Sequence, residues 1–224
     1  MKILKIIFSF LMLPLVLVSI YELIKLILDF AVKSNMTAAP FWIGIIVYFL
    51  FQVIFFKPMR TYVFGHELTH AVAGLLSGAQ IKKIKVSKNG GSVTLTKDSV
   101  FISLAPYFVP FYSLIIIIIY LSLGWFTDTR PFYPYFLFLS GFALAFHFAL
   151  TFYALTIGQE DLKTYGVFFS FIFICFINCI IISLILILIF PQYINISGYF
   201  HDVGADAFFT YKYIFAKISH LIKS

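Results

Sequence analysis

The sequence predicts an all-α polytopic membrane protein of about six transmembrane helices, with one small membrane-proximal β-hairpin. Two observations carry this prediction. Of the 224 residues, 62% are hydrophobic and only 11% are charged, a balance far from that of a soluble domain. The apolar residues also gather in several runs of about 20 residues, the length that an α-helix needs to cross the hydrocarbon core of a bilayer.

Six apolar segments follow one another along the chain. The first contains a proline but lacks a small-x-small cleavage site, so we expect an uncleaved helix. Pro106 and Pro110 fall within the fourth segment and predict a kink there. We expect a single membrane domain over residues 1–224, with residues 41–190 as its core. The predicted segments are 6–23, 41–56, 61–76, 99–125, 132–157 and 165–190.

Residues 79–97 depart from the apolar pattern. Lysines alternate with Ile84 and Val86, and threonines alternate with apolar residues further along. The sequence Asn89-Gly90-Gly91 between these two arms is typical of a tight turn. The stretch therefore predicts a β-hairpin, with a solvated connecting loop as the alternative.

The charge pattern fits a lipid environment. The formal net charge is +7, and we expect the basic residues to flank membrane segments and meet anionic headgroups rather than nucleic acid. Residues 191–224 form a mixed tail whose last part can fold into an amphipathic helix on the membrane surface. Cys175 and Cys179 lie four apart in an apolar segment, where packing is the expected role.

The sequence His66-Glu67-Leu68-Thr69-His70 places three ionisable groups in one turn of an apolar segment. On a helix, residues four apart share one face, so the two imidazoles would point at a common spot. This is the H-E-x-x-H pattern, in which two histidines bind zinc and the glutamate acts as base toward a water molecule. An ionisable residue at bilayer depth costs about 2.5–3.5 kcal/mol on insertion scales, so three together indicate a functional site.

A catalytic zinc site usually takes a third protein ligand. The turn around Asp161 is expected on the same membrane face as the hairpin, and Asp161 would open the sixth helix facing inward. Glu160 is the alternative ligand, and Asp98 after the hairpin is a further candidate. His147 in the fifth segment is expected either to orient a ligand or substrate or to be an ordinary membrane histidine bonded to a carbonyl.

These residues resemble the site-2 protease family of intramembrane zinc metalloproteases. The resemblance covers about residues 41–190 and rests on the HELTH run, the stop at Gly78, the lysine-rich hairpin with its Gly-Gly turn, Leu104-Ala105-Pro106 and the downstream acidic turn. The separation between His70 and Asp161, 91 residues by subtraction of their numbers, is similar to that in the family.

The resemblance implies that His66, His70 and Asp161 bind one Zn²⁺ per chain and that Glu67 is the general base. It implies a substrate that is a membrane protein with a transmembrane segment, cut near the cytoplasmic face. The hairpin would accept the unwound substrate as an added strand. We accordingly expect an integral protein of a prokaryotic cell membrane, of unspecified oligomeric state.

The acidic turn departs from the family. The family's Asp-Gly pair, with its upstream Asn and Pro, is replaced by Gly158-Gln159-Glu160-Asp161. The resemblance leaves open whether Gln159 or His147 takes the role of the Asn.

Other functions stay open. Prenyl-protein proteases also carry H-E-x-x-H in membranes but use a glutamate as third ligand, which would be Glu160. A non-proteolytic metal-binding or transporting membrane protein would use the same histidines, although it gives Glu67 no particular role. A catalytically silent relative is a third possibility, disfavoured by the intact HELTH run.

Overall fold

The computed structural model describes residues 2–55, 58–87 and 90–223. Helices make up 81% of it, so the prediction of a mainly helical chain is confirmed. The chain forms two compact units, one of residues 1–34 with 166–224 and one of residues 35–165. Each unit is described by itself, and the expected single domain stays a prediction. Asn89, part of the predicted turn, lies outside the described residues.

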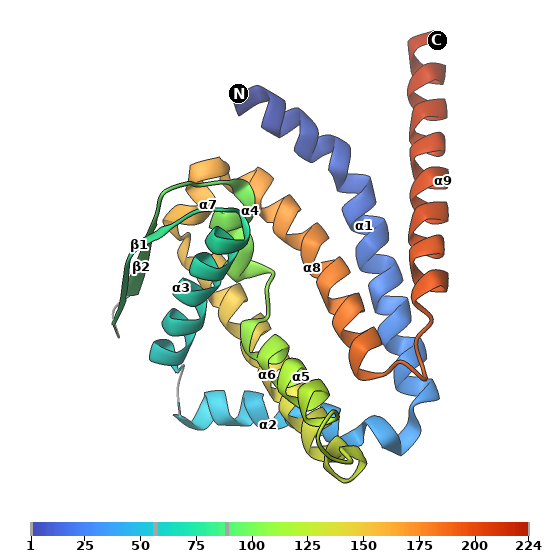
Figure 1. Ribbon diagram of the computed structural model, residues 1–224. Helices are drawn as coiled ribbons and strands as arrows, with labels where there is room; N and C mark the ends of the chain where they lie inside the picture. Colours follow the sequence, from blue (N-terminus) through green and yellow to red (C-terminus); the bar gives the residue numbers. More distant parts are fainter. Residues whose placement is uncertain (1, 56–57, 88–89, 224) are drawn as a thin grey trace. The chain divides into compact units, whose positions relative to one another are not determined.

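The first unit consists of three helices, α1 (Lys2–Lys33), α8 (Val167–Ile189) and α9 (Ile196–Lys223). Helix α1 packs against both α8 and α9 (Figure 1). It runs well beyond the end of the predicted first segment, because the charged residues there pair along the helix. Lys25 Nζ lies 3.1 Å from a carboxylate oxygen of buried Glu22.

Helix α9 follows α1 in the opposite direction. The Lys25 ammonium lies 3.6 Å from the Asp202 carboxylate near the start of α9. Further along, the Tyr211 hydroxyl donates to the Leu11 carbonyl at 2.6 Å. The predicted helix of the tail is therefore present, while its location on a membrane surface stays a prediction.

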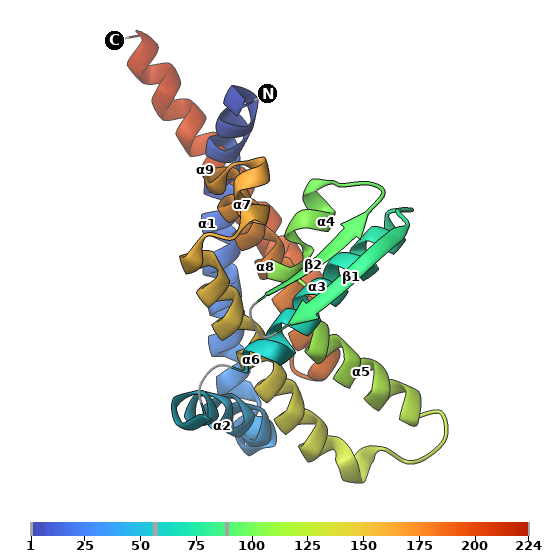
Figure 2. The ribbon, with the colours of Figure 1, turned by 90° about the vertical axis from the view of Figure 1, so that its left-hand side faces the viewer.

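The scaffold of the second unit is the crossing of α2 (Ala39–Phe55) and α6 (Tyr133–Ile157) (Figure 2). Glycines let the two backbones touch. A Cβ atom at Gly44 would meet the Phe138 carbonyl oxygen, and one at Gly141 would meet the Phe41 carbonyl oxygen. Such close backbone approach through small residues is typical of helix pairs in membranes.

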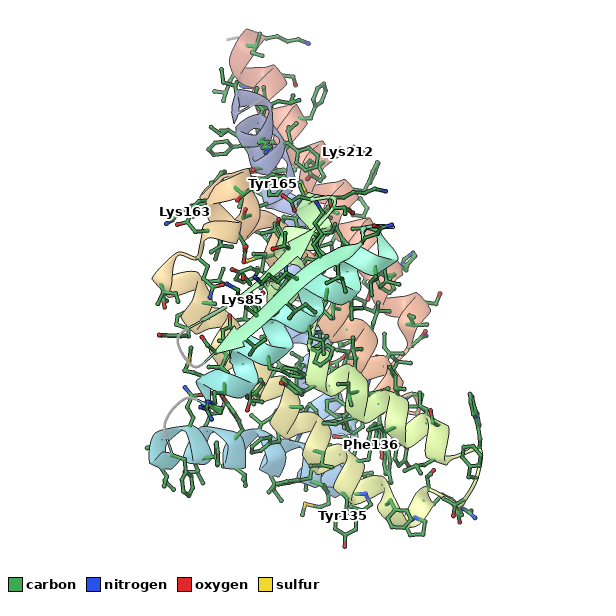
Figure 3. All side chains as sticks on the ribbon, turned by 60° about the vertical axis from the view of Figure 1, so that its left-hand side comes forward. Lys85, Tyr135, Phe136, Lys163, Tyr165 and Lys212 are labelled. Atoms are coloured by element: carbon green, nitrogen blue, oxygen red, sulfur yellow. The ribbon has the colours of Figure 1, made fainter. Side chains whose placement is uncertain are left out.

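Helix α5 (Phe111–Leu123) packs on the same α6 and is joined to it through η3 (Arg130–Phe132). The rings of Tyr120 and Phe136 stack with centroids 4.0 Å apart. On α6, Phe136 is buried whereas the neighbouring Tyr135 is exposed, as their opposite directions in Figure 3 show. Helix α6 thus buries one face against the core and exposes another.

The predicted count of about six spans is not confirmed. Four helices are long and apolar enough to cross a membrane, or five if α4 (Val100–Leu104) with η2 (Ala105–Tyr107) and α5 form one span bent by 80°. Pro106 and Pro110 lie at this bend, so the predicted kink is confirmed. Helix α3 (Met59–Leu76) is not among the candidate spans, because the HELTH residues lower its hydropathy.

The predicted hairpin is confirmed. Strands β1 (Ile81–Ser87) and β2 (Gly90–Leu95) pair antiparallel, with Ser87 opposite Gly90. Both strands contact α3, and the hairpin lies along this helix in Figure 2. Gly78 has φ +71° and ends α3 as a helix C-cap should.

The expectation that Asp161 opens the sixth helix is wrong. Asp161 lies in a separate short helix, α7 (Glu160–Tyr165), and α8 begins only at Val167. Gly158 and Gly166, with φ of +65° and +95°, bound this helix on either side. Left-handed backbone at both positions turns the chain sharply, which a continuous helix would not allow.

We predict that Gly141→Ala lowers the thermal unfolding midpoint of the protein in detergent. The added methyl meets the Phe41 carbonyl, and overpacking of this kind costs about 1–3 kcal/mol. The matched control is Gly204→Ala in α9, where a Cβ meets nothing within 4 Å. Equal midpoints for the two variants would contradict the close crossing of α2 and α6.

Candidate metal centre

The two histidines of α3 lie on one face of the helix, as their spacing predicts. Their ring centroids are 4.9 Å apart, and His66 is buried. The helix approaches α5 closely here, since a Cβ atom at Gly65 would lie 2.7 Å from the Tyr112 ring. The Tyr112 hydroxyl also donates to the Thr61 carbonyl at 2.7 Å. This contact positions the N-terminal half of α3, and with it the first imidazole.

Asp161 meets both imidazoles. Its Oδ2 atom lies 3.4 Å from His66 Nε2 and 3.5 Å from His70 Nε2. These distances are long for hydrogen bonds. They match the separation of about 3.3 Å that metal–ligand bonds of 2.0–2.1 Å give in a tetrahedral zinc site. The ligand atoms of all three residues lie within 4.8 Å of one another, so this donor set fits a zinc ion.

The outer nitrogens of the imidazoles have partners that orient the rings. His70 Nδ1 lies 2.8 Å from the Ile102 carbonyl oxygen, to which it can only donate. His66 Nδ1 lies 3.3 Å from the Tyr62 hydroxyl. A proton on Nδ1 leaves Nε2 as the ligand atom, which is the arrangement that supporting groups enforce in metal sites.

Tyr107 supports the carboxylate from the other side. Its buried hydroxyl lies 3.1 Å from Asp161 Oδ2 and 2.7 Å from the Gln159 Oε1 atom, and it can donate its proton to either. Burial disfavours the charge on Asp161, but the neighbouring imidazoles of His66 and His70 outweigh it and hold the pKa of this carboxyl well below its ordinary value. Asp161 is therefore an anion, as a metal ligand must be.

The structure brings Asp161 rather than Glu160 to the imidazoles. The Glu160 side chain is 88% exposed and lies 2.8 Å from Lys163 Nζ. Figure 3 shows Lys163 on α7, at the outer surface of this turn. Successive residues of a helix point in different directions, so only one of the two acids can face the α3 histidines.

Asp98, considered as a ligand, instead holds α7 in place. Its carboxylate accepts hydrogen bonds from the Ser103 hydroxyl at 2.7 Å and the Tyr165 hydroxyl at 3.1 Å. Tyr165, labelled in Figure 3, is the last residue of α7. Asp98 thus ties the helix that carries Asp161 to the start of α4.

His147 lies beside the site but not in the main pocket. With Tyr62, His66 and Tyr112 it lines a cavity of about 20 Å³, roughly the space of one water molecule. Gln159 lies in the main pocket and bonds Tyr107. Of the two candidates for an orienting side chain, Gln159 is the one that the structure joins, through the Tyr107 hydroxyl, to the metal-ligand candidate Asp161.

Glu67 is only 6% exposed and borders a pocket of about 900 Å³. The same pocket is lined by His66 and His70, by consecutive residues of β2 and by the turn that carries Asp161. A pocket of this volume is in the range of sites that take up substrates. The general-base candidate and the three metal-ligand candidates therefore face one space.

Sequence reasoning missed Tyr62 and Tyr107. Tyr62 lies four residues before His66, on the same helical face, which was the available signal. Tyr107 directly follows the Leu104-Ala105-Pro106 stretch, but no spacing rule places its hydroxyl near a residue 54 positions away.

The family model described as Peptidase M50B-like matches residues 39–200. The chain belongs to this family. It is the site-2 protease family, so the resemblance drawn from the sequence is confirmed. Comparisons with curated proteins and with solved structures give no match.

Membership of the M50B-like family supports a metallopeptidase. The match spans α3, the hairpin and α7, so every residue of the His-His-Asp group falls within it. Together with the apolar helices, the family indicates an integral membrane protein.

We predict that Tyr107→Phe weakens metal binding by this M50B-like chain by about ten- to a hundredfold, the usual effect of losing a hydrogen bond to a ligand. Competition with a chelator of known affinity measures the change. Tyr120→Phe is the control, because it removes a hydroxyl that donates to the Thr129 carbonyl, outside the pocket lining. Unchanged affinity in the Tyr107 variant would show that its hydroxyl does not support the site.

Proposed function

We propose that this protein is an intramembrane zinc metalloprotease, which hydrolyses peptide bonds within or near transmembrane segments of membrane proteins. One observation carries the proposal. The ligand atoms of His66, His70 and Asp161 lie within 4.8 Å of one another, although Asp161 is 91 positions beyond His70. Glu67 lines the same pocket.

The residues of the site have separate roles in this reaction. His66, His70 and Asp161 would hold the ion, and a bound zinc supplies a Lewis acid that polarises a carbonyl and acidifies water. Glu67 takes the proton from the attacking water and returns it to the leaving amine. Tyr107 keeps Asp161 in position during both steps.

The hairpin offers a way to hold an unwound substrate. In the described chain β2 has β1 as its pairing partner, so its second edge has backbone groups for a further strand. Residues Gly90–Val93 of β2 line the pocket beside the metal ligands. A substrate strand added there keeps its backbone hydrogen-bonded while it is unwound in an apolar environment.

The proposed setting is the lipid bilayer of a prokaryotic cell membrane, with the site near the cytoplasmic face. The partner is a membrane protein with a transmembrane segment. Exposed lysines on the hairpin, such as Lys85, which is labelled in Figure 3, favour the face with anionic headgroups. The amphipathic α9 is proposed to contact the same lipids.

We predict that His66→Ala loses bound zinc, whereas Glu67→Gln retains about one zinc per chain and loses cleavage of a co-expressed single-span substrate. A ligand is removed in the first variant and only the base in the second. Metal analysis of purified protein and immunoblotting of the substrate check the two results. Undiminished zinc in the His66 variant would refute the assignment.

Asp161→Ala is expected to lose zinc and activity, while Glu160→Ala keeps both. Asp161 lies among the imidazoles, whereas Glu160 pairs with Lys163 at the surface. The same metal analysis, run on both variants in parallel, makes the comparison. The opposite outcome would favour a glutamate ligand of the prenyl-protein protease type.

A further inference from the structure

Gly91 of β2 lies directly on the side chain of Glu67. A Cβ atom at Gly91 would stand 2.5 Å from Glu67 Cγ and 2.7 Å from Glu67 Oε1. Real Cβ atoms essentially never come this close to another heavy atom. Any side chain at this position would therefore displace the carboxylate, the strand or both.

The backbone itself does not require glycine at this position. Gly90 has φ +140°, in the region that favours glycine, but Gly91 is not among the glycines with positive φ. Alanine can therefore adopt the backbone of Gly91 without strain. The three heavy atoms nearest to such a Cβ all belong to Glu67, so the requirement for glycine comes from this side chain.

A second contact fixes which strand residue meets Glu67. A Cβ atom at Gly74 would lie 2.7 Å from Leu95 Cδ1, so Leu95 packs directly on α3. Four strand residues from Gly91 to Leu95 span about 13 Å, and seven helix residues from Glu67 to Gly74 span about 10.5 Å. Strand β2 therefore runs along α3 with matched contacts at both ends.

We infer that Gly91 is a positioning residue for Glu67. This inference rests on the proposed function, because it assigns Glu67 as the base. The strand whose second edge faces the pocket also holds the carboxylate in place through the Cα atom of Gly91. The position of the hairpin along α3 then determines the position of the base. Leu95 packed on Gly74 holds one end of β2, and Gly91 packed on Glu67 holds the other.

The metal ligands are not part of this contact. Tyr62 contacts and orients His66, and the Ile102 carbonyl orients His70. Tyr107 orients Asp161. A methyl group at position 91 is therefore expected to move the base and leave the bound ion unchanged. This separation distinguishes Gly91 from residues that support the ligands.

The test combines activity with a double-mutant cycle of Gly91→Ala and Glu67→Ala. Gly91→Ala should keep zinc and lower kcat by about ten- to a hundredfold, the usual effect of a misplaced catalytic group, with KM changed by less than about twofold. Glu67→Ala removes the Cγ, Cδ and Oε1 atoms that the added methyl meets. Because it also removes the proposed base, the cycle itself is read on the unfolding midpoint.

A second readout needs neither metal nor activity. In the metal-free protein, Gly91→Ala should lower the thermal unfolding midpoint, and the drop should be smaller when Glu67→Ala is present, because the atoms that the methyl meets are then absent. Gly204→Ala adds the same methyl where nothing lies within 4 Å, so it should leave zinc and kcat unchanged and should not lower the midpoint, since alanine is favoured over glycine inside a helix. Thr94→Ala, an exposed β2 position outside the pocket lining, controls for a general change in the strand.

Each result has a definite meaning. Wild-type kcat in Gly91→Ala, an equal drop of the unfolding midpoint with Glu67 and with Glu67→Ala, or loss of zinc would overturn the role of Gly91. A wild-type protein that binds zinc but cleaves no membrane substrate would refute the proposed function. In that case the unfolding midpoints still decide whether Gly91 and Glu67 are coupled.

Discussion

The structure of the second unit depends on the burial of polar groups on α3. His66 and Glu67 are among the few buried ionisable side chains of the chain as described, and each would be costly to bury without partners. The histidines find partners far along the sequence: His66 has the Asp161 carboxylate on α7, and His70 has the Ile102 carbonyl on α4. Elements that are too short to cross a membrane are thereby drawn together around one helix.

Glycine determines how closely these elements approach. At Gly44 and Gly141 the absence of a side chain lets α2 and α6 touch. At Gly74 and Gly91 the same property brings β2 onto α3. Packing at the crossing concerns stability, whereas packing at the hairpin concerns the position of Glu67, the proposed base, so the same residue type has a different consequence in each place.

The sequence predicted the parts of the site that local spacing controls. Two imidazoles four residues apart on a helix share one face, and the lysine–apolar alternation on either side of Gly90 and Gly91 favoured a hairpin over a solvated loop. Asp161 could be proposed from topology and from the family. The separate helix α7 could not, because the positive φ at Gly166 that ends it is a tertiary outcome that glycine permits without requiring. Tyr107 was missed because its contact with Asp161 depends on the bend at Pro106 and Pro110.

The bend at Pro106 and Pro110 is one reason why the predicted count of about six spans is not confirmed. Residues 99–125 do not form one straight helix. The 80° break instead leaves α4 and η2 beside α3, where the Ile102 carbonyl and the Tyr107 hydroxyl each reach a metal-ligand candidate. The exposed carbonyls of a broken helix are costly in lipid unless they bond elsewhere. The Ile102 carbonyl accepts a hydrogen bond from His70 Nδ1. The break in the helix thus supplies the carbonyl that orients this imidazole.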